Sequence, residues 1–201
     1  MAIAEKMLVA RFGSKIVNHK TYCLVGDGCL MEGISYEAVS IAGHLGLSNL
    51  IVLWDNNSIS IDGNTNLSTS ENIKMRFEAC NWKVIEIDGH DFDQIRTAFS
   101  QAQNSDKPVM ISCKTIIAFG SPHKAGSEKS HGSPLGEKEV KETRDNLGWN
   151  YEPFVVPDHL LIKWREAGLR SDNLYKEWHN NLFHLDGGLK NEFLHSQERG
   201  F

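Results

Sequence analysis

The stretch VGDGCLMEGISYEA, residues 25–38, sets an aspartate between two glycines, directly before the start of a helical pattern. The run TYCLV that leads into it, at 21–25, is typical of a fully buried parallel strand. From Glu32 onward, apolar residues recur with the 3.6-residue period of a helix, which Gly46 closes. The next apolar run, NLIVLWD at 49–55, reads as a second buried strand. The stretch therefore predicts a strand, a turn, a helix and a strand in that order.

The same alternation continues along the rest of the chain, and it favours an α/β fold in which a parallel sheet carries helices on both faces. The further elements that we expect are a helix up to about Phe12 with Gly13 as its stop, a helix around 70–80 capped by Thr69 or Ser70, the strand WKVIEI, a helix from Phe92 to about Gln103 capped by Asp91, the strand VMISCKT, a helix from about Glu137 to Asn146 and a helical region from about Pro157 to Phe183. The last residues, from His184, are weakly patterned and are expected to fray.

Composition excludes several classes of partner. The 201 residues carry a formal net charge of -5, so no basic field is available for binding nucleic acid. No apolar run reaches the length of about 18 residues that a membrane span needs, and the N-terminus lacks a signal-peptide pattern. The cysteines form no CxxC pair, and we interpret them as reduced, buried thiols of a cytoplasmic protein; they are Cys23, Cys29, Cys80 and Cys113.

Two polar motifs follow the first two predicted strands. Asp27 supplies an anionic oxygen and Asn57 a neutral amide oxygen, and the loop after Asn57 can add a backbone carbonyl. Such oxygen ligands suit Mg²⁺ or Ca²⁺ and are poor for Zn²⁺. One carboxylate cannot hold Mg²⁺ tightly, and a phosphorylated ligand is the usual completion. Gly26 and Gly28 would let a diphosphate approach the backbone near the following helix. The ends of adjacent parallel strands lie together, so the motifs predict a metal-bridged diphosphate site.

An isolated GDG is more often an ordinary turn, because all three residues suit turns. The combination is more specific, since GDG, a helix, a buried strand and Asn56-Asn57 occur in order with 27 residues between Gly28 and Asn56. This arrangement resembles the signature of thiamin diphosphate-binding proteins. The segments GDGCLMEGISYEA, DNNSISIDG, MRFEACNWKVIEIDGHD, KPVMISCKTIIAFGSPHKAG and SHGSPLGEKEV closely resemble transketolase, with dihydroxyacetone synthase as a near relative.

The resemblance implies a thiamin diphosphate-binding fold, with an incomplete diphosphate domain at 1–160 that lacks its N-terminal portion, and a helical extension or linker at 161–201. It implies thiamin diphosphate and Mg²⁺ or Ca²⁺ as cofactors. The activity implied is transfer of a two-carbon ketol unit from a ketose phosphate to an aldose phosphate, in the pentose phosphate pathway. A pyrimidine-binding domain would come from a partner chain or from a homodimer.

The resemblance also assigns roles to individual residues. Asp27 and Asn57 would ligate the metal through their side chains, and Ile59 through its carbonyl. Gly28 would contact the diphosphate, and Ile117 would lie against the thiazolium region. Glu32, in the first turn of its helix, would lie at the dimer interface, and His131 would reach both cofactor and substrate as the catalytic histidine. On general grounds a loop histidine is more often a solvated surface residue. We leave the other histidines, His123 among them, under that interpretation, with His90 as a turn or cap residue.

Two functions stay open at this point. The chain is either a segment of a transketolase that needs partner domains for activity, or a non-catalytic fragment or remnant with residual metal and diphosphate binding. A dihydroxyacetone synthase-type relative is a further alternative. The start at Met1 within a helical pattern leads us to expect that the chain is truncated at both ends.

Overall fold

The computed structural model describes residues 1–198, and its contacts divide the chain into two compact units. The sheet unit is residues 20–150, and the helical unit combines residues 3–19 with the chain from residue 151 onward. The expected end of the diphosphate domain at residue 160 is a different kind of boundary from these structural units, and it stays a prediction.

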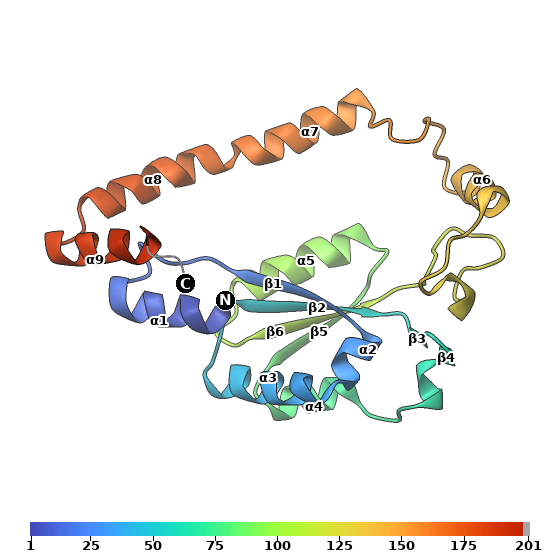
Figure 1. Cartoon of the computed structure of the whole chain (residues 1–201), viewed down its shortest axis with the longest axis horizontal. Coiled ribbons are helices and arrows are strands. Elements are labelled where there is room, and N and C mark those ends of the chain that lie inside the picture. The colour runs from blue at the N-terminus through green and yellow to red at the C-terminus, as the bar shows by residue number, and fades with distance from the viewer. Residues whose placement is uncertain (199–201) are drawn as a thin grey trace. The chain divides into compact units, whose positions relative to one another are not determined.

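The sheet unit is built on four parallel strands in the order β1-β2-β6-β5 (Figure 1). The strands are β1 (Thr21–Gly26), β2 (Leu50–Asn56), β5 (Lys83–Asp88) and β6 (Val109–Lys114). The register sets Gly26 beside Asp55, so β1 and β2 end together. This confirms the predicted parallel sheet, and it brings the segments after the first two strands to one edge.

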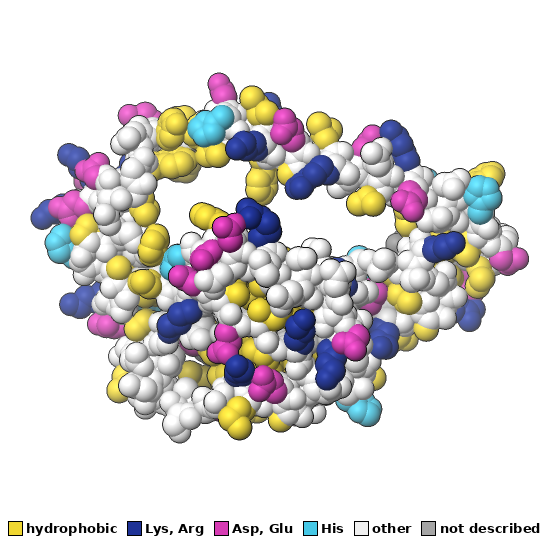
Figure 2. All heavy atoms as spheres, turned by 180° about the vertical axis from the view of Figure 1, so that it is seen from behind, with side chains coloured by type: hydrophobic (Ala, Val, Ile, Leu, Met, Phe, Trp, Pro, Cys, Tyr) yellow, Lys and Arg dark blue, Asp and Glu magenta, His cyan; other side chains and the backbone are white. Residues whose placement is uncertain are grey.

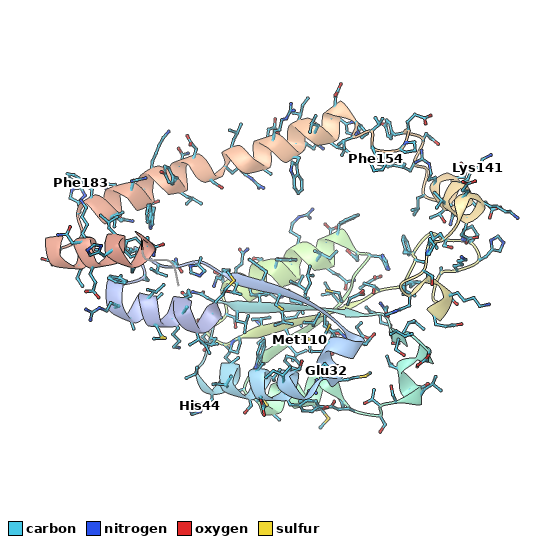
Figure 3. The ribbon with its side chains drawn as sticks, in the orientation of Figure 1. Glu32, His44, Met110, Lys141, Phe154 and Phe183 are labelled. Carbon is cyan, nitrogen blue, oxygen red and sulfur yellow. The ribbon has the colours of Figure 1, made fainter. Side chains whose placement is uncertain are left out.

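Helices cover both faces of the sheet, as the alternating pattern predicted. One face carries α3 (Gly33–His44) and α4 (Ile73–Ala79), and the other carries α5 (Phe92–Gln103). Two apolar clusters fill the layers between them. The first contains Val39, Ala42, Val52, Trp54, Phe77 and Met110, and the second contains Ile51, Ile87, Ala98, Ala102, Val109 and Ile111. Met110 is labelled within the sheet in Figure 3. Burial of this apolar surface is the main force that holds the layers together.

The ends of the helices match the sequence predictions in part. Asp91 caps α5 as expected, because its side chain accepts hydrogen bonds from the backbone N–H groups of Asp93 and Gln94. The cap expected for α4 at Thr69 or Ser70 is wrong. Asn72 caps it instead, accepting from the N–H of Met75, and the helix begins at Ile73. Asparagine caps a helix as well as serine does, so the run TSEN at 69–72 offers several possible caps and its first polar residue does not mark the start of the helix.

The prediction that β1 is fully buried is wrong. Leu24 is 82% exposed, and Tyr22 and Cys23 are exposed as well. The physical reason is that β1 is an edge strand of the four-stranded sheet and pairs with β2 on one side only. The thiols of Cys23 and Cys29 are therefore exposed rather than buried, and those of Cys80 and Cys113 are only partly buried; all four are free.

The segments at the carboxyl edge of the sheet form short elements. They are α2 (Asp27–Met31), the antiparallel hairpin of β3 (Ile59–Ser60) and β4 (Gly63–Asn64), the 3₁₀ turns η1 (Thr65–Leu67) and η2 (Glu128–Ser130), and α6 (Glu137–Asn146). The GDG motif was expected to form a turn between strand and helix, whereas Asp27 already begins a short helix. Glu32 then interrupts it with extended backbone (φ -66°, ψ 139°) before α3 starts.

The helical unit contains α1 (Ala2–Phe12), α7 (Asp158–Leu169), α8 (Ser171–Phe183) and α9 (Gly187–Glu198). Gly13 ends α1 as predicted, with a positive φ of 84°. The single helical region expected from Pro157 is two helices that meet at Arg170. The expected fraying from His184 is wrong as far as residue 198, because Phe193 of α9 is buried against Phe12 and Leu182; residues 199–201 lie outside the described residues.

Among residues 1–198, no helix is long and apolar enough to cross a membrane. On the face shown in Figure 2, basic and acidic side chains are intermixed and no basic patch gathers.

Candidate functional site

The candidate site lies where β1 and β2 end side by side. Asp27 is the first residue of α2 and follows β1 directly, and Asn57 follows β2 directly. Because the two strands are hydrogen-bonded neighbours in parallel register, the two polar motifs meet at one edge of the sheet. This is the arrangement that the sequence predicted.

Asp27 is fixed by two donors that come from β2 and the turn after it. Its Oδ1 accepts a hydrogen bond from Nε1 of Trp54 at 3.1 Å, and its Oδ2 accepts from the backbone N–H of Ser58 at 2.9 Å. Ser58 has a positive φ of 64°, a conformation that is costly for a residue with a side chain. The strained backbone of Ser58 is the conformation in which its N–H donates to Asp27.

The charge of Asp27 is incompletely balanced. Burial raises the pKa of its carboxyl group, and the neighbouring Asp55 raises it further. The hydrogen bonds from Trp54 and Ser58 and the charge of Lys114 lower the pKa, but the net shift is upward. Asp27 takes part in no salt bridge within the described chain. A half-buried carboxylate whose ionised form is penalised is one that a bound cation would stabilise.

Asn57 and Ile59 complete the set of oxygen donors. Oδ1 of Asn57 accepts from the N–H of Ile59 at 2.9 Å, and its Nδ2 donates to Oδ2 of Asp55 at 3.2 Å. The two contacts orient the amide so that its oxygen lies on the side of the β3–β4 hairpin, while a second lone pair on that oxygen stays available. Ile59 begins β3, which places its backbone carbonyl in the same turn.

The backbone beside Asp27 leaves room for a ligand. A Cβ atom added to Gly26 or Gly28 would meet no other atom within 4 Å. An open backbone next to hard oxygen donors suits a diphosphate that shares a Mg²⁺ or Ca²⁺ with the protein. The residues present therefore fit the group that the sequence predicted.

Ile117 lies in the segment that follows β6, and His90 contacts this segment. His90 accepts a hydrogen bond at Nε2 from the N–H of Ile116 at 3.1 Å, and its ring stacks on Phe119 at 4.0 Å. Ile117 itself is partly buried, and its carbonyl accepts from the N–H of Gly126 at 2.9 Å. His90 thus links two loops, a role beyond the turn or cap residue that the sequence suggested.

His131 and Glu32 are not joined to this cluster. His131 follows η2 with its side chain exposed, and within the described chain no hydrogen bond connects it to Asp27 or Asn57. Glu32 was expected in the first turn of a helix, which is wrong, because it lies in the break between α2 and α3, where Figure 3 labels it. Its side chain is exposed and makes no capping hydrogen bond.

Sequence reasoning missed the residues that support the site. Trp54 read only as an apolar strand residue, although its indole N–H holds Asp27. Lys114 ends β6 and donates from Nζ to Oγ of Ser58 at 2.8 Å, and Thr115 donates to Asp55. These contacts follow from the pairing of β2 with β6, which sets Asp55 beside Cys113 and Asn56 beside Lys114. That pairing could not be read from chain order.

Comparison with known proteins gives one consistent result. The family model described as "Transketolase, thiamine diphosphate binding domain" matches residues 1–191. A transketolase of Rhodobacter capsulatus is 48% identical over 200 residues, covering 100% of this chain and 30% of the relative. Transketolase 1 of Escherichia coli is 50% identical over 184 residues, covering 88% of this chain and 28% of the relative. The crystal structure of transketolase from Campylobacter jejuni aligns with a TM-score of 0.90 and 42% identity, over 96% of this chain and 30% of that one.

Proposed function

The chain belongs to the transketolase family, and from that premise we propose that its sheet edge anchors the diphosphate of thiamin diphosphate through a bound Mg²⁺ or Ca²⁺. The observation that carries the proposal is Asp27, a half-buried carboxylate with a raised pKa and no salt-bridge partner in the described chain, set beside the open backbone of Gly28. A divalent cation there would compensate the charge that the protein leaves unbalanced.

Asp27 and Asn57 would ligate the metal through their side-chain oxygens, and Ile59 through its carbonyl. The hydrogen bonds from Trp54 and Ser58 support this role, because they fix the Asp27 carboxylate before any ligand arrives. Gly28 would contact the diphosphate. Preorganised ligands reduce the ordering cost of binding, which is what an anchor for a charged cofactor requires.

The cofactor supplies the carbon chemistry, since its thiazolium can stabilise a carbanion. The protein's part is to bind and orient. Ile117 would lie against the thiazolium region, where the His90 contact to Ile116 keeps its segment in position. His131 would stabilise charge on the substrate oxygen or move a proton at that oxygen. Its exposed ring, in a loop rich in Gly and Ser, is free to meet a substrate that enters from solvent.

The activity of the whole protein is a further part of the proposal, because the chain spans about 30% of the length of the curated relatives it matches. We propose that it contributes to two-carbon ketol transfer between sugar phosphates. The pyrimidine-binding domain would come from a partner chain or a second copy, with Glu32 at that interface. We also place the protein in the cytoplasm, on the basis of its four free cysteines.

The test is ketol transfer from xylulose 5-phosphate to ribose 5-phosphate, measured with the chain alone and with a pyrimidine-binding domain added. Transfer is expected only in the complex and only with thiamin diphosphate and a divalent metal. His131→Ala should lower the rate at least tenfold, whereas His159→Ala, at an exposed position of α7, should leave it unchanged. Absence of transfer in the complex would contradict the proposed activity, and equal rates for parent and His131→Ala would remove the histidine's role.

A further inference from the structure

Three metal-ligating side chains converge away from the diphosphate site, where the loop after β6 meets α6. His123 lies in the loop, and Glu139 and Glu142 lie three residues apart on one side of α6. Nδ1 of His123 is 3.1 Å from Oε2 of Glu139 and 3.4 Å from Oε2 of Glu142. One ligand atom from each residue lies within 4.8 Å of the others. His123 was expected to be a solvated surface histidine; its side chain is 68% exposed, as expected, and its Nδ1 also lies close to two carboxylates.

Two donors hold one oxygen of Glu139, and the other oxygen faces His123. Its Oε1 accepts hydrogen bonds from the hydroxyl of Ser121 and from the backbone N–H of His123, the latter at 2.8 Å. Its side chain is only 10% exposed. The two bonds fix the carboxylate, and Oε2 is the oxygen that faces the cluster. Support of this kind, from groups behind a ligand, is what orients carboxylates in metal sites.

One carboxylate oxygen of Glu142 is buried without a hydrogen-bond donor among the described residues. Its Oε2 is buried and accepts no hydrogen bond from any residue that the structure describes. Its other oxygen, Oε1, lies 3.8 Å from Nζ of the exposed Lys138. The Nδ1 of one imidazole can donate a single hydrogen, so it cannot satisfy Glu139 and Glu142 together. A buried acceptor therefore faces the centre of the cluster without a partner.

A tetrahedral zinc ion would satisfy all three groups. Zinc binds histidine nitrogen and carboxylate oxygen at about 2.0–2.2 Å, so ligand atoms around it lie about 3.3–3.5 Å apart. The separations of 3.1 Å and 3.4 Å from His123 Nδ1 agree with that spacing. An imidazole ligand favours Zn²⁺ over Mg²⁺ or Ca²⁺. We propose that His123, Glu139 and Glu142 form a structural Zn²⁺ site, with water as fourth ligand, that ties the loop to α6.

The site has a consequence for the loop that follows it. His131 lies between His123 and α6, in a segment joined to the sheet unit at both ends. A metal that joins the two ends of this segment would restrict its motion. The zinc proposal does not depend on the function proposed above, because it shares no residue with the diphosphate site.

Zinc titration of the metal-free chain tests the proposal, by calorimetry and by the visible absorption bands of Co²⁺ in place of Zn²⁺. The expected result is one ion per chain, with the bands of tetrahedral cobalt. His123→Ala and Glu142→Gln should each weaken binding at least tenfold, and Glu137→Gln, the same charge change at an exposed position of α6, should not. Glu139 is left intact in these variants because it also supports the fold.

Absence of zinc binding would overturn the proposal. Equal affinity in the parent and both site variants would also overturn it, because zinc would then be bound by other histidines. Melting curves in chelator show whether each variant is folded, and Glu142→Gln alters only a partly exposed side chain. Asp27→Ala separates the two sites: it should leave the zinc affinity unchanged even where it removes binding of thiamin diphosphate.

Discussion

Asp27 at the sheet edge and Glu139 at the start of α6 are both shielded carboxylates, yet their surroundings shift their pKa values in opposite directions. The hydroxyl of Ser121 and the backbone N–H of His123 lower the pKa of Glu139 to about 2. Burial raises the pKa of Asp27 above its ordinary value. Asp27 accepts two hydrogen bonds, one at each oxygen. Glu139 accepts two at one oxygen, and the His123 imidazole lies within hydrogen-bond distance of the other.

The difference lies in what balances the charge. Both donors of Glu139 converge on a single oxygen, and an imidazole lies at the other. Asp27 has a second carboxylate, Asp55, as a neighbour, and its donors do not offset the loss of hydration. Hydrogen bonds from the fold therefore stabilise the ionised form of Glu139, whereas burial penalises that of Asp27, for which we propose a bound cation as the compensation. Variants at the two positions should therefore affect different properties.

The largest effect is expected at Asp27. Asp27→Ala removes the one anionic ligand of the proposed metal site, and affinity for thiamin diphosphate in the presence of Mg²⁺ should fall by roughly 100-fold or more. Calorimetry measures the change. Asp62→Ala, on the exposed turn between β3 and β4, is the matched control and should bind as the parent does. Unchanged affinity in Asp27→Ala would contradict the proposal that Asp27, unlike Glu139, binds the metal that holds the cofactor.

The second effect is on stability. Glu139→Ala leaves the Ser121 hydroxyl and the His123 N–H without their acceptor, so the melting temperature in chelator should fall by roughly 5–10 °C. Glu137→Ala, exposed on the same helix, should change it by no more than about 1 °C. The affinity for Mg²⁺ and thiamin diphosphate should stay within about threefold of the parent. A loss of affinity as large as that in Asp27→Ala would show that the two regions are not independent.

The third effect is a dependence on pH. The pKa of Glu139 falls from 4.5 in the unfolded chain to about 2 in the folded one, so its stabilisation is complete above pH 4.5 and is lost as the pH falls toward 2. The difference in melting temperature between parent and Glu139→Ala should therefore shrink on acidification below pH 4.5. A difference that is constant from pH 7 to pH 3 would disprove this origin. Asp27 has the opposite sign, because a raised pKa makes its ionised form a cost to the folded chain above pH 3.8.

The smallest effect is expected at Ser58. Its φ of 64° is easier for glycine, so Ser58→Gly should raise the melting temperature by about 1–2 °C and leave the N–H that Asp27 accepts. Ser68→Gly is the control, since Ser68 has an ordinary φ of -124° and the change should lower the melting temperature. A fall in both variants would show that the hydroxyl contact to Lys114 outweighs the strain.

The sequence predicted the parallel sheet with helices on both faces, because apolar periodicity and strand order reflect burial directly. It also predicted that Asp27 and Asn57 follow neighbouring strands. Periodicity could not show that β1 is an edge strand, because an edge strand and a central strand have the same apolar pattern. The helix α9 was missed for a related reason: its contact with Phe12 joins segments far apart in the chain.

The supporting contacts of the site were beyond sequence reasoning. Trp54, Lys114 and His90 act through cross-strand register and loop contacts that no local motif encodes. The contacts of the exposed His123 with Glu139 and Glu142 were missed because these partners lie 16 and 19 positions further along the chain. The roles of Ile117, His131 and Glu32 came from resemblance alone, and they stay predictions.

The most direct test of the metal-bridged anchor is the binding of Mn²⁺, in place of Mg²⁺, followed by its electron paramagnetic resonance signal. One Mn²⁺ per chain should become bound when thiamin diphosphate is added, and Asn57→Ala should abolish that uptake. Mn²⁺ binding that is the same with and without thiamin diphosphate, or the same in Asn57→Ala as in the parent, would contradict the account.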